Sequence, residues 1–192
     1  LYGLDKPIVE RYGNWLAAAA QGDFGYSRIH NRPVLEILGD RLWNTIWLMA
    51  LSLLVSLAVA LPIGVTSALK PYSKTDYAIN FAALAGISVP VFWLALMLIV
   101  VFSVMLGWLP AGGMSTLGAD SALDRARFMV LPVIALSVAS IGGLTRYVRA
   151  AMMEVMRHDY VRTARAKGLP RHRVVLKHAL RNAMIPVVTI LA

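Results

Sequence analysis

Charged side chains are absent from three long runs of this sequence, which cover residues 42–69, 77–119 and 128–145. About 20 apolar residues suffice to cross the hydrocarbon core of a bilayer as a helix, so each run is long enough to form a span. A soluble protein that buried three such helices would need more polar surface than this chain supplies. The pattern therefore predicts an all-α, polytopic membrane protein.

Residues between and within these runs divide them into spans. Trp43 and Trp47 stand at the start of the first run, where aromatic rings prefer the membrane interface. The segment GWLPAGG interrupts the second run, since its glycines and proline disfavour a helix. We expect spans at about 42–69, 79–106 and 128–147, and the start of a further span near residue 183.

Residues 1–41 differ from the rest of the chain in composition, because five Lys or Arg side chains balance five Asp or Glu side chains. The piece PIVERYGNWLAAAA predicts a short amphipathic helix, and QGDFGYSRIHNRP is typical of a turn-rich loop. The chain starts without an initiator Met and stops within an apolar run. We interpret it as an internal fragment that lacks its first and last spans.

Basic residues are distributed unevenly among the segments that connect the spans. Residues 1–41 and 114–127 carry equal numbers of bases and acids, whereas KPYSKTDY at 70–77 carries two bases and one acid. The stretch 146–181 carries ten bases and two acids. Because Lys and Arg gather on the cytoplasmic side of membrane proteins, we expect 1–41 and 107–127 to lie outside and the two basic segments to lie in the cytoplasm.

Candidate catalytic and metal-binding residues are scarce. The sequence has no Cys, and the spacing of its four His residues matches no metal site: His30, His158, His172 and His178. It also lacks the Gly-x-x-x-x-Gly-Lys phosphate loop that binds ATP. The predicted spans carry no ionisable residue near their centres, which argues against an ion-coupled carrier. We expect no catalytic residue, no metal and no cofactor.

The basic stretch YVRTARAKGLPRHRVVLKHALRN, at 160–182, contains signals for a short separate helix. Asp159 is suited to cap its N-terminus, and Gly168 is suited to the left-handed conformation that closes a helix. Pro170 lies just beyond and is able to open the next helix. A helix of about eight residues is unstable alone, so we expect it to be packed against other structure.

Three interpretations of this helix are open from the residues alone. It is a packed loop whose charge only fixes topology, a contact for anionic lipid or nucleic acid, or a docking element for a cytoplasmic protein that moves the spans. Tyr160 is the only Phe, Trp or Tyr in the stretch, which disfavours nucleic acid. Ala164, Ala166 and Gly168 are small enough to allow a partner surface to approach closely.

The same stretch resembles the cytoplasmic signature loop of ABC importer permeases, in the dipeptide and oligopeptide branch. In that loop a Glu-Ala-Ala sequence is followed, after three residues, by Gly, and Ala164 and Gly168 match its second Ala and its Gly. Arg162 and Thr163 stand where the Glu and first Ala would be, and the closing Pro comes late, at Pro186. Further blocks in matching order extend the resemblance over nearly the whole chain: GDFGYS at 22–27, RPV at 32–34, GWLPAGG at 107–113 and LPVIALSVASIGGLTRYVRAAM at 131–152.

The resemblance implies an architecture and a set of partners. Such permeases are all-α membrane proteins of the MetI-like type in the bacterial inner membrane, and each pairs with a sister permease. Two ATP-binding subunits dock on the cytoplasmic side, and an extracytoplasmic binding protein delivers a dipeptide, a longer peptide, glutathione or nickel. For this chain it implies an extracytoplasmic segment over 1–41, a permease domain over 42–192 and a coupling loop over 148–182, without enzymatic activity or a nucleic-acid partner.

The resemblance also assigns roles to particular residues. A coupling helix at about 160–168 transmits the movement of the ATP-binding subunits, and its implied residues are Tyr160, Arg162, Thr163, Ala164, Lys167 and Gly168, with Asp159 and Pro170 as caps. Ser88, Pro90 and Trp93 are candidates for the translocation path, with simple helix packing as an equal alternative. An ion-coupled carrier and a membrane-anchored regulator that uses the basic stretch to bind lipid or nucleic acid are the rival classes of protein.

Overall fold

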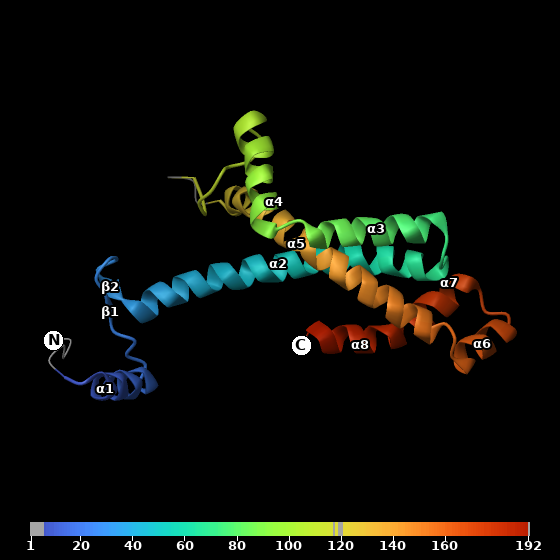
Figure 1. Ribbon diagram of the computed structural model, residues 1–192, viewed down its shortest axis with the longest axis horizontal. Coiled ribbons are helices and arrows are strands. Elements are labelled where there is room, and N and C mark those ends of the chain that lie inside the picture. The colour runs from blue at the N-terminus through green and yellow to red at the C-terminus, as the bar shows by residue number, and fades with distance from the viewer. Residues whose placement is uncertain (1–5, 117, 119–120, 192) are drawn as a thin grey trace. The chain divides into compact units, whose positions relative to one another are not determined.

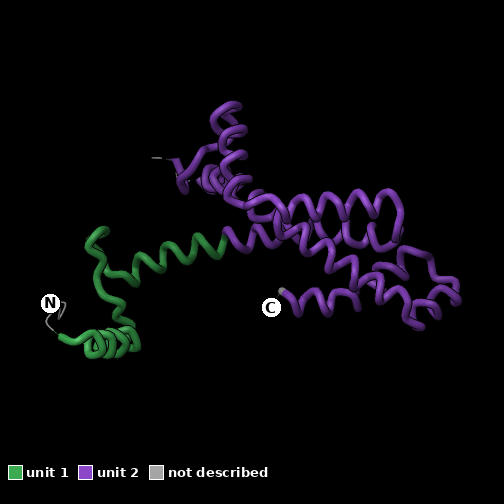
Figure 2. The backbone as a smooth tube through the Cα atoms, in the orientation of Figure 1, with its two compact units in different colours: residues 1–47 green, residues 48–192 purple. Residues whose placement is uncertain are grey.

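Helices make up nearly all of the regular structure in the computed structural model of this protein, which describes residues 6–116, 118 and 121–191. The fold is all-α, as the hydropathy pattern predicts. The chain forms two compact units, residues 1–47 and 48–192 (Figure 2).

The first unit contains a short helix, a small hairpin and the beginning of the next helix. Helix α1 (Ile8–Ala20) confirms the predicted amphipathic helix, and strands β1 (Tyr26–Ser27) and β2 (Arg32–Pro33) pair antiparallel within the predicted turn-rich loop. The Tyr26 hydroxyl donates a 2.6 Å hydrogen bond to the backbone oxygen of Asn31, which closes the turn at a φ of 53°. The hairpin leads directly into the long helix that follows.

The remaining elements are helical throughout (Figure 1). They are α2 (Val34–Leu69), α3 (Lys74–Ser88), α4 (Val91–Leu98), the π-helix η1 (Ile99–Met105), α5 (Ala122–Val155), α6 (Asp159–Ala166), α7 (Arg171–Arg173), the π-helix η2 (Val174–Leu180) and α8 (Arg181–Leu191). In the described part of the chain, α2 and α5 are each long and apolar enough to cross a membrane. The α3 helix together with α4 and η1 forms a third crossing if the bent pair is a single span.

A sharp bend interrupts the segment that the sequence predicts as one span over 79–106. The helices on either side of the break are bent by 92°. Val89 is extended, with ψ at 122°, and Pro90 follows it with ψ at 128°. Proline disfavours helical geometry in the residue before it and has no N–H for a helical hydrogen bond, so the helix stops here and restarts at Val91.

Small residues at every fourth position allow α2 to pack closely against α5. These residues are buried: Ser52, Ser56, Ala60, Gly64 and Ala68. A Cβ on Gly64 would lie 2.8 Å from the Cβ of Val148 and 2.9 Å from the carbonyl oxygen of Thr145. Near the other end of the contact, the Ser137 hydroxyl donates to the Ser52 carbonyl at 3.1 Å. Close backbone approach and hydroxyl bonds of this kind are how helices associate in membranes.

The α3 helix lies along α5 in a similar way. A Cβ on Gly142 would lie 2.5 Å from the carbonyl oxygen of Ala83 and 2.8 Å from the Cγ1 of Ile87. Only a glycine fits between these groups, so α3 and α5 are in contact at their backbones.

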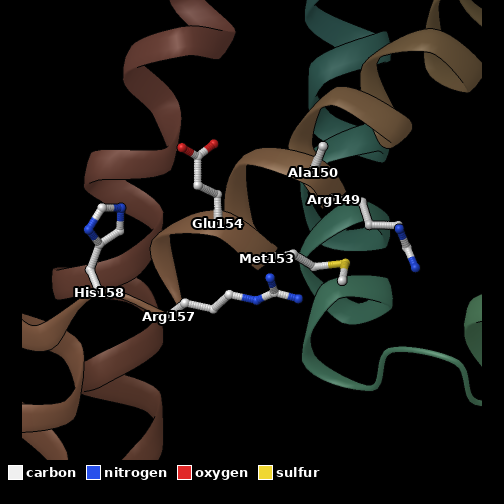
Figure 3. A pocket seen from close by; sticks show the side chains of 6 residues that line it. All are labelled: Arg149, Ala150, Met153, Glu154, Arg157 and His158. Atoms are coloured by element: carbon white, nitrogen blue, oxygen red, sulfur yellow. The ribbon is translucent and has the colours of Figure 1, made fainter.

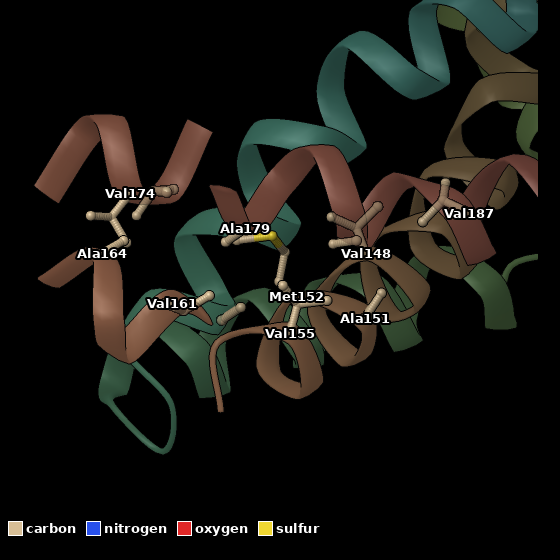
Figure 4. Packing of buried hydrophobic residues seen from close by; sticks show 12 residues of the cluster. Val148, Ala151, Met152, Val155, Val161, Ala164, Val174, Ala179 and Val187 are labelled. Atoms are coloured by element: carbon tan, nitrogen blue, oxygen red, sulfur yellow. The ribbon is translucent and has the colours of Figure 1, made fainter. Parts of the chain in front are cut away.

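The main hydrophobic core lies where the end of α5 meets the C-terminal helices (Figure 4). Its buried members are Ala68, Val148, Ala151, Met152, Val155, Val161, Ala164, Val174, Val175, Ala179, Ala183 and Val187. They come from α2, α5, α6, η2 and α8, so this core holds the long basic loop against the two long helices. It meets the requirement that the short helix be packed against other structure.

Candidate functional site

The short helix α6 is closed by a Schellman motif at its C-terminal end. The N–H of Gly168 donates to the Arg165 carbonyl at 2.9 Å, and the N–H of Leu169 donates to the Ala164 carbonyl at 3.3 Å. Gly168 has a φ of +74°, as the sequence predicts. Pro170 then precedes α7 as its N-terminal cap, also as predicted. These two bonds and the proline set the end of α6 and the direction of the chain after it.

The N-terminal cap of α6 is one residue earlier than predicted. His158 is the cap residue, with ψ at 148°, and its side chain makes no capping hydrogen bond. Asp159 is instead the first residue of the helix, where its charge favours the positive end of the helix dipole. Its carboxylate accepts a 3.2 Å hydrogen bond from Arg162. The sequence marked the helix start correctly to within one residue, which is the usual uncertainty of a helix boundary.

Two side chains fix α6 to the rest of the chain. Val161 is fully buried and Ala164 is 5% exposed, and both belong to the hydrophobic core. Figure 4 shows Ala164 next to Val174 of η2. The small size of Ala164 therefore serves a close contact of α6 with its own chain. Val161 was missed, although its spacing of three from Ala164 indicates the inner face of a helix.

The outer surface of α6 presents most of the residues that the resemblance implies. Tyr160, Arg162, Thr163 and Lys167 are exposed, and so is Gly168 at the end of the helix. The Tyr160 ring stacks on the ring of His158, with ring centroids 5.5 Å apart. The exposed surface is basic and contains one aromatic ring.

A second polar site, which the sequence interpretation missed, surrounds Asp76 in the first turn of α3. The Asp76 side chain is 2% exposed. Arg149 donates to both carboxylate oxygens, each at 2.7 Å. The Ser67 hydroxyl and, at 2.8 Å each, the Tyr72 backbone N–H and the Asn80 side-chain amide also donate to the carboxylate. Asp76 and Arg149 therefore form a bidentate ion pair, and four residues in all donate hydrogen bonds to the carboxylate.

The sequence held a weak signal for this pair. Asp76 is the only acid of its connecting segment, and Arg149 follows shortly after an uncharged run. A buried acid needs a buried base, and breaking such a pair by removing one partner costs about 3–5 kcal/mol. Nothing in the local pattern, however, indicates which of the many Arg residues is the partner.

A pocket of about 610 Å³ opens beside Arg149 along the end of α5 (Figure 3). It is lined by Arg149, Ala150, Met153, Glu154, Arg157 and His158. Figure 3 shows Arg149 and Glu154 directed away from one another. In the described part of the chain, no cluster of three or more His, Asp or Glu residues is placed to hold a metal ion.

The three residues suggested for a translocation path lie together at the bend between α3 and α4. Ser88 ends α3, Pro90 caps α4, and Trp93 lies in the first turn of α4 with 49% of its surface exposed. The Ser88 hydroxyl donates to the Leu84 carbonyl at 2.9 Å, so it is satisfied within its own helix.

These features define a class of protein: a polytopic α-helical membrane protein with a short helix held firmly on a basic connecting loop. The family model for the inner membrane component of binding-protein-dependent transport systems matches residues 60–192. The chain belongs to this family, as the resemblance in the sequence predicts.

Individual relatives match almost the whole chain. It is 47% identical, over 98% of its length, to the oligopeptide transport system permease protein AppB of Bacillus subtilis. A putative peptide permease protein of Brucella ovis is 42% identical over the same share. The glutathione transport system permease protein GsiC of Escherichia coli K12 is 41% identical over 98% of this chain. The chain spans about 60% of the length of these relatives.

Proposed function

We propose that this chain is part of a permease subunit of an ATP-driven importer in the bacterial inner membrane. The family consists of inner membrane components of binding-protein-dependent transport systems. Its proposed partners are a sister permease, two ATP-binding subunits and an extracytoplasmic solute-binding protein. Relatives are named for oligopeptides and for glutathione, so a peptide is the proposed solute. The chain itself binds no ATP and has no enzymatic activity in this proposal.

The observation that supports this function most is the way α6 is held. The Schellman bonds at Gly168 fix the end of α6, and the burial of Val161 and Ala164 packs the helix against the core. A loop that served only topology or lipid attraction would need charge but no fixed shape. A helix that passes on the movement of a partner has to be rigid, because a flexible segment absorbs the displacement.

The exposed face of α6 is suited to a protein partner with an acidic docking surface. Arg162 and Lys167 are exposed on it, and Tyr160 adds an aromatic side chain of the kind enriched at interfaces. In the proposed cycle, ATP binding draws the two ATP-binding subunits together and pulls α6 with them. The passage then opens to the other side of the membrane, because the nucleotide favours one of the two conformations.

The bend between α3 and α4 is the proposed part of the passage. Helices that break within a membrane expose backbone groups that need protein or water around them. Ser88, Pro90 and Trp93 lie at this break, so we propose that they line the translocation path.

Crosslinking from α6 tests the proposal. The 192 residues contain no Cys, so Thr163→Cys introduces a unique thiol into this part of the full-length permease. In membranes containing the complete importer, a thiol-reactive crosslinker should capture an ATP-binding subunit, in a yield that changes with ATP. Ala164→Cys is the matched control, because its side chain faces the core and should capture nothing.

Either result is informative. Capture of the ATP-binding subunit by residue 163 supports the coupling role. If an intact complex gives no such capture, α6 does not couple the permease to an ATP-binding subunit. Lipid attraction or topology then explains the basic loop.

A further inference from the structure

The buried site at Asp76 has no part in the function proposed so far, although it connects three helices. Asp76 lies in the first turn of α3, Arg149 lies near the end of α5, and Ser67 lies in the last turn of α2. We propose that the Asp76–Arg149 pair is a joint that passes the movement of α6 to the α2–α3 hairpin, which is the two helices α2 and α3 with their connection at residues 70–73. This inference rests on the proposed function, since it concerns how that movement reaches the spans.

The first step runs from α6 to Arg149 through packed side chains. Val161 and Ala164 of α6 belong to the same core as Val148 and Met152 of α5. Val148 is adjacent to Arg149 in sequence and only 1% exposed. A displacement of α6 therefore moves the turn of α5 that carries Arg149, because close-packed interiors transmit strain.

The second step links Arg149 of α5 to the α2–α3 hairpin. The two 2.7 Å bonds are formed by the guanidinium Nε and a terminal nitrogen, one to each carboxylate oxygen. A planar bidentate pair fixes orientation as well as distance, which a single bond or an apolar contact does not.

The carboxylate in turn holds the connection between α2 and α3. It accepts from the backbone N–H of Tyr72 within that connection and from the Ser67 hydroxyl at the end of α2. Tyr72 has a φ of +59°, so the turn adopts a conformation that a non-glycine residue rarely takes without support. Asp76 thus links the turn between α2 and α3 to Arg149 of α5.

The test replaces Asp76 by Asn in the full-length permease, within the complete importer reconstituted in proteoliposomes. Solute uptake per ATP hydrolysed should fall about tenfold, the effect of losing one coupling contact, while ATP hydrolysis continues. Arg146→Gln removes an exposed charge from the same helix and should leave this ratio unchanged. If uptake and hydrolysis fall together in Asp76→Asn, the pair is not a joint.

A double variant separates coupling from folding. Asp76→Asn leaves the Arg149 charge without its partner, so thermal stability falls as well. Adding Arg149→Gln removes that lone charge and should restore the thermal midpoint while uptake per ATP stays low. If the double variant recovers both the thermal midpoint and the uptake per ATP hydrolysed, the pair only stabilises the fold.

The same preparations distinguish this inference from the function on which it rests. Crosslinking from residue 163 is measured in the parent and in each variant. If the Thr163→Cys protein without further changes fails to capture an ATP-binding subunit, the proposed coupling role of α6 is overturned. Retained capture with an unchanged ratio of uptake to hydrolysis in Asp76→Asn overturns only the joint.

Discussion

Gly168 is the residue whose conformation most directly sets the shape of the proposed coupling helix. Its φ of +74° lies in the left-handed region, and nothing lies within 4 Å of the position a Cβ would take. The cost of a side chain here is therefore one of backbone strain and not of collision. Left-handed geometry costs a non-glycine residue about 1–2 kcal/mol.

We expect Gly168→Val to disrupt the Schellman closure and to reduce transport strongly, while insertion into the membrane persists. Gly168→Asn is the matched variant, because Asn tolerates positive φ, and it should retain most of the activity. Transport by the two variants is measured as solute uptake in vesicles, normalised to the amount of permease in the membrane. Equal activity of the Val and Asn variants would show that the closure has no role in transport.

At the scale of elements, the contact between α2 and α5 depends on small residues. Gly64 is the tightest point described there, since a Cβ would lie 2.8 Å from the Cβ of Val148 and 2.9 Å from a backbone oxygen. A backbone oxygen is unable to rotate away as a side chain does. Adding even one methyl group therefore forces the helices apart.

We expect Gly64→Ala to destabilise the protein by about 1–3 kcal/mol, the usual cost of overpacking. Gly143→Ala is the control, because Gly143 also lies in a helix and has nothing within 4 Å of its added Cβ. In that position alanine is a better helix former than glycine, so stability should hold or rise. The measurement is the thermal midpoint of each variant in detergent. A midpoint for Gly64→Ala at or above that of Gly143→Ala would contradict the close contact between α2 and α5 at Gly64.

At the scale of the whole molecule, the uneven distribution of basic residues predicts the orientation in the membrane. Residues 70–77 and 146–182 carry an excess of bases and are expected in the cytoplasm. Residues 1–41 and 107–127 are expected on the outer side. The proposed docking of α6 requires this arrangement, since ATP is on the cytoplasmic side.

Single cysteines test the orientation, because residues 1–192 contain no Cys of their own. Ile29→Cys and Met114→Cys, at positions that are 91% and 49% exposed, should react with a membrane-impermeant thiol reagent in intact cells. Lys70→Cys and Thr163→Cys should react only after the membrane is permeabilised. Labelling of residue 163 from outside would exclude the proposed docking.

Much of this architecture follows from the sequence because the signals are local. A run of uncharged residues predicts a membrane helix through its length and composition alone, and Gly168 with Pro170 predicts the end of α6 because backbone conformation is a property of neighbouring residues. The family was recognisable for the same reason, since its signature lies in short blocks.

The tertiary structure alone decided which side chains meet. Ala164 faces its own core, which only the packing of α6 on η2 reveals. The 92° bend at Pro90 divides a stretch that the hydropathy pattern presents as one span. Asp76 and Arg149 are 73 residues apart, and the sequence does not encode their pairing in any short pattern. Local conformation depends on neighbouring residues, whereas the partner of a buried charge depends on which helices pack together, and that is settled only when the whole chain folds.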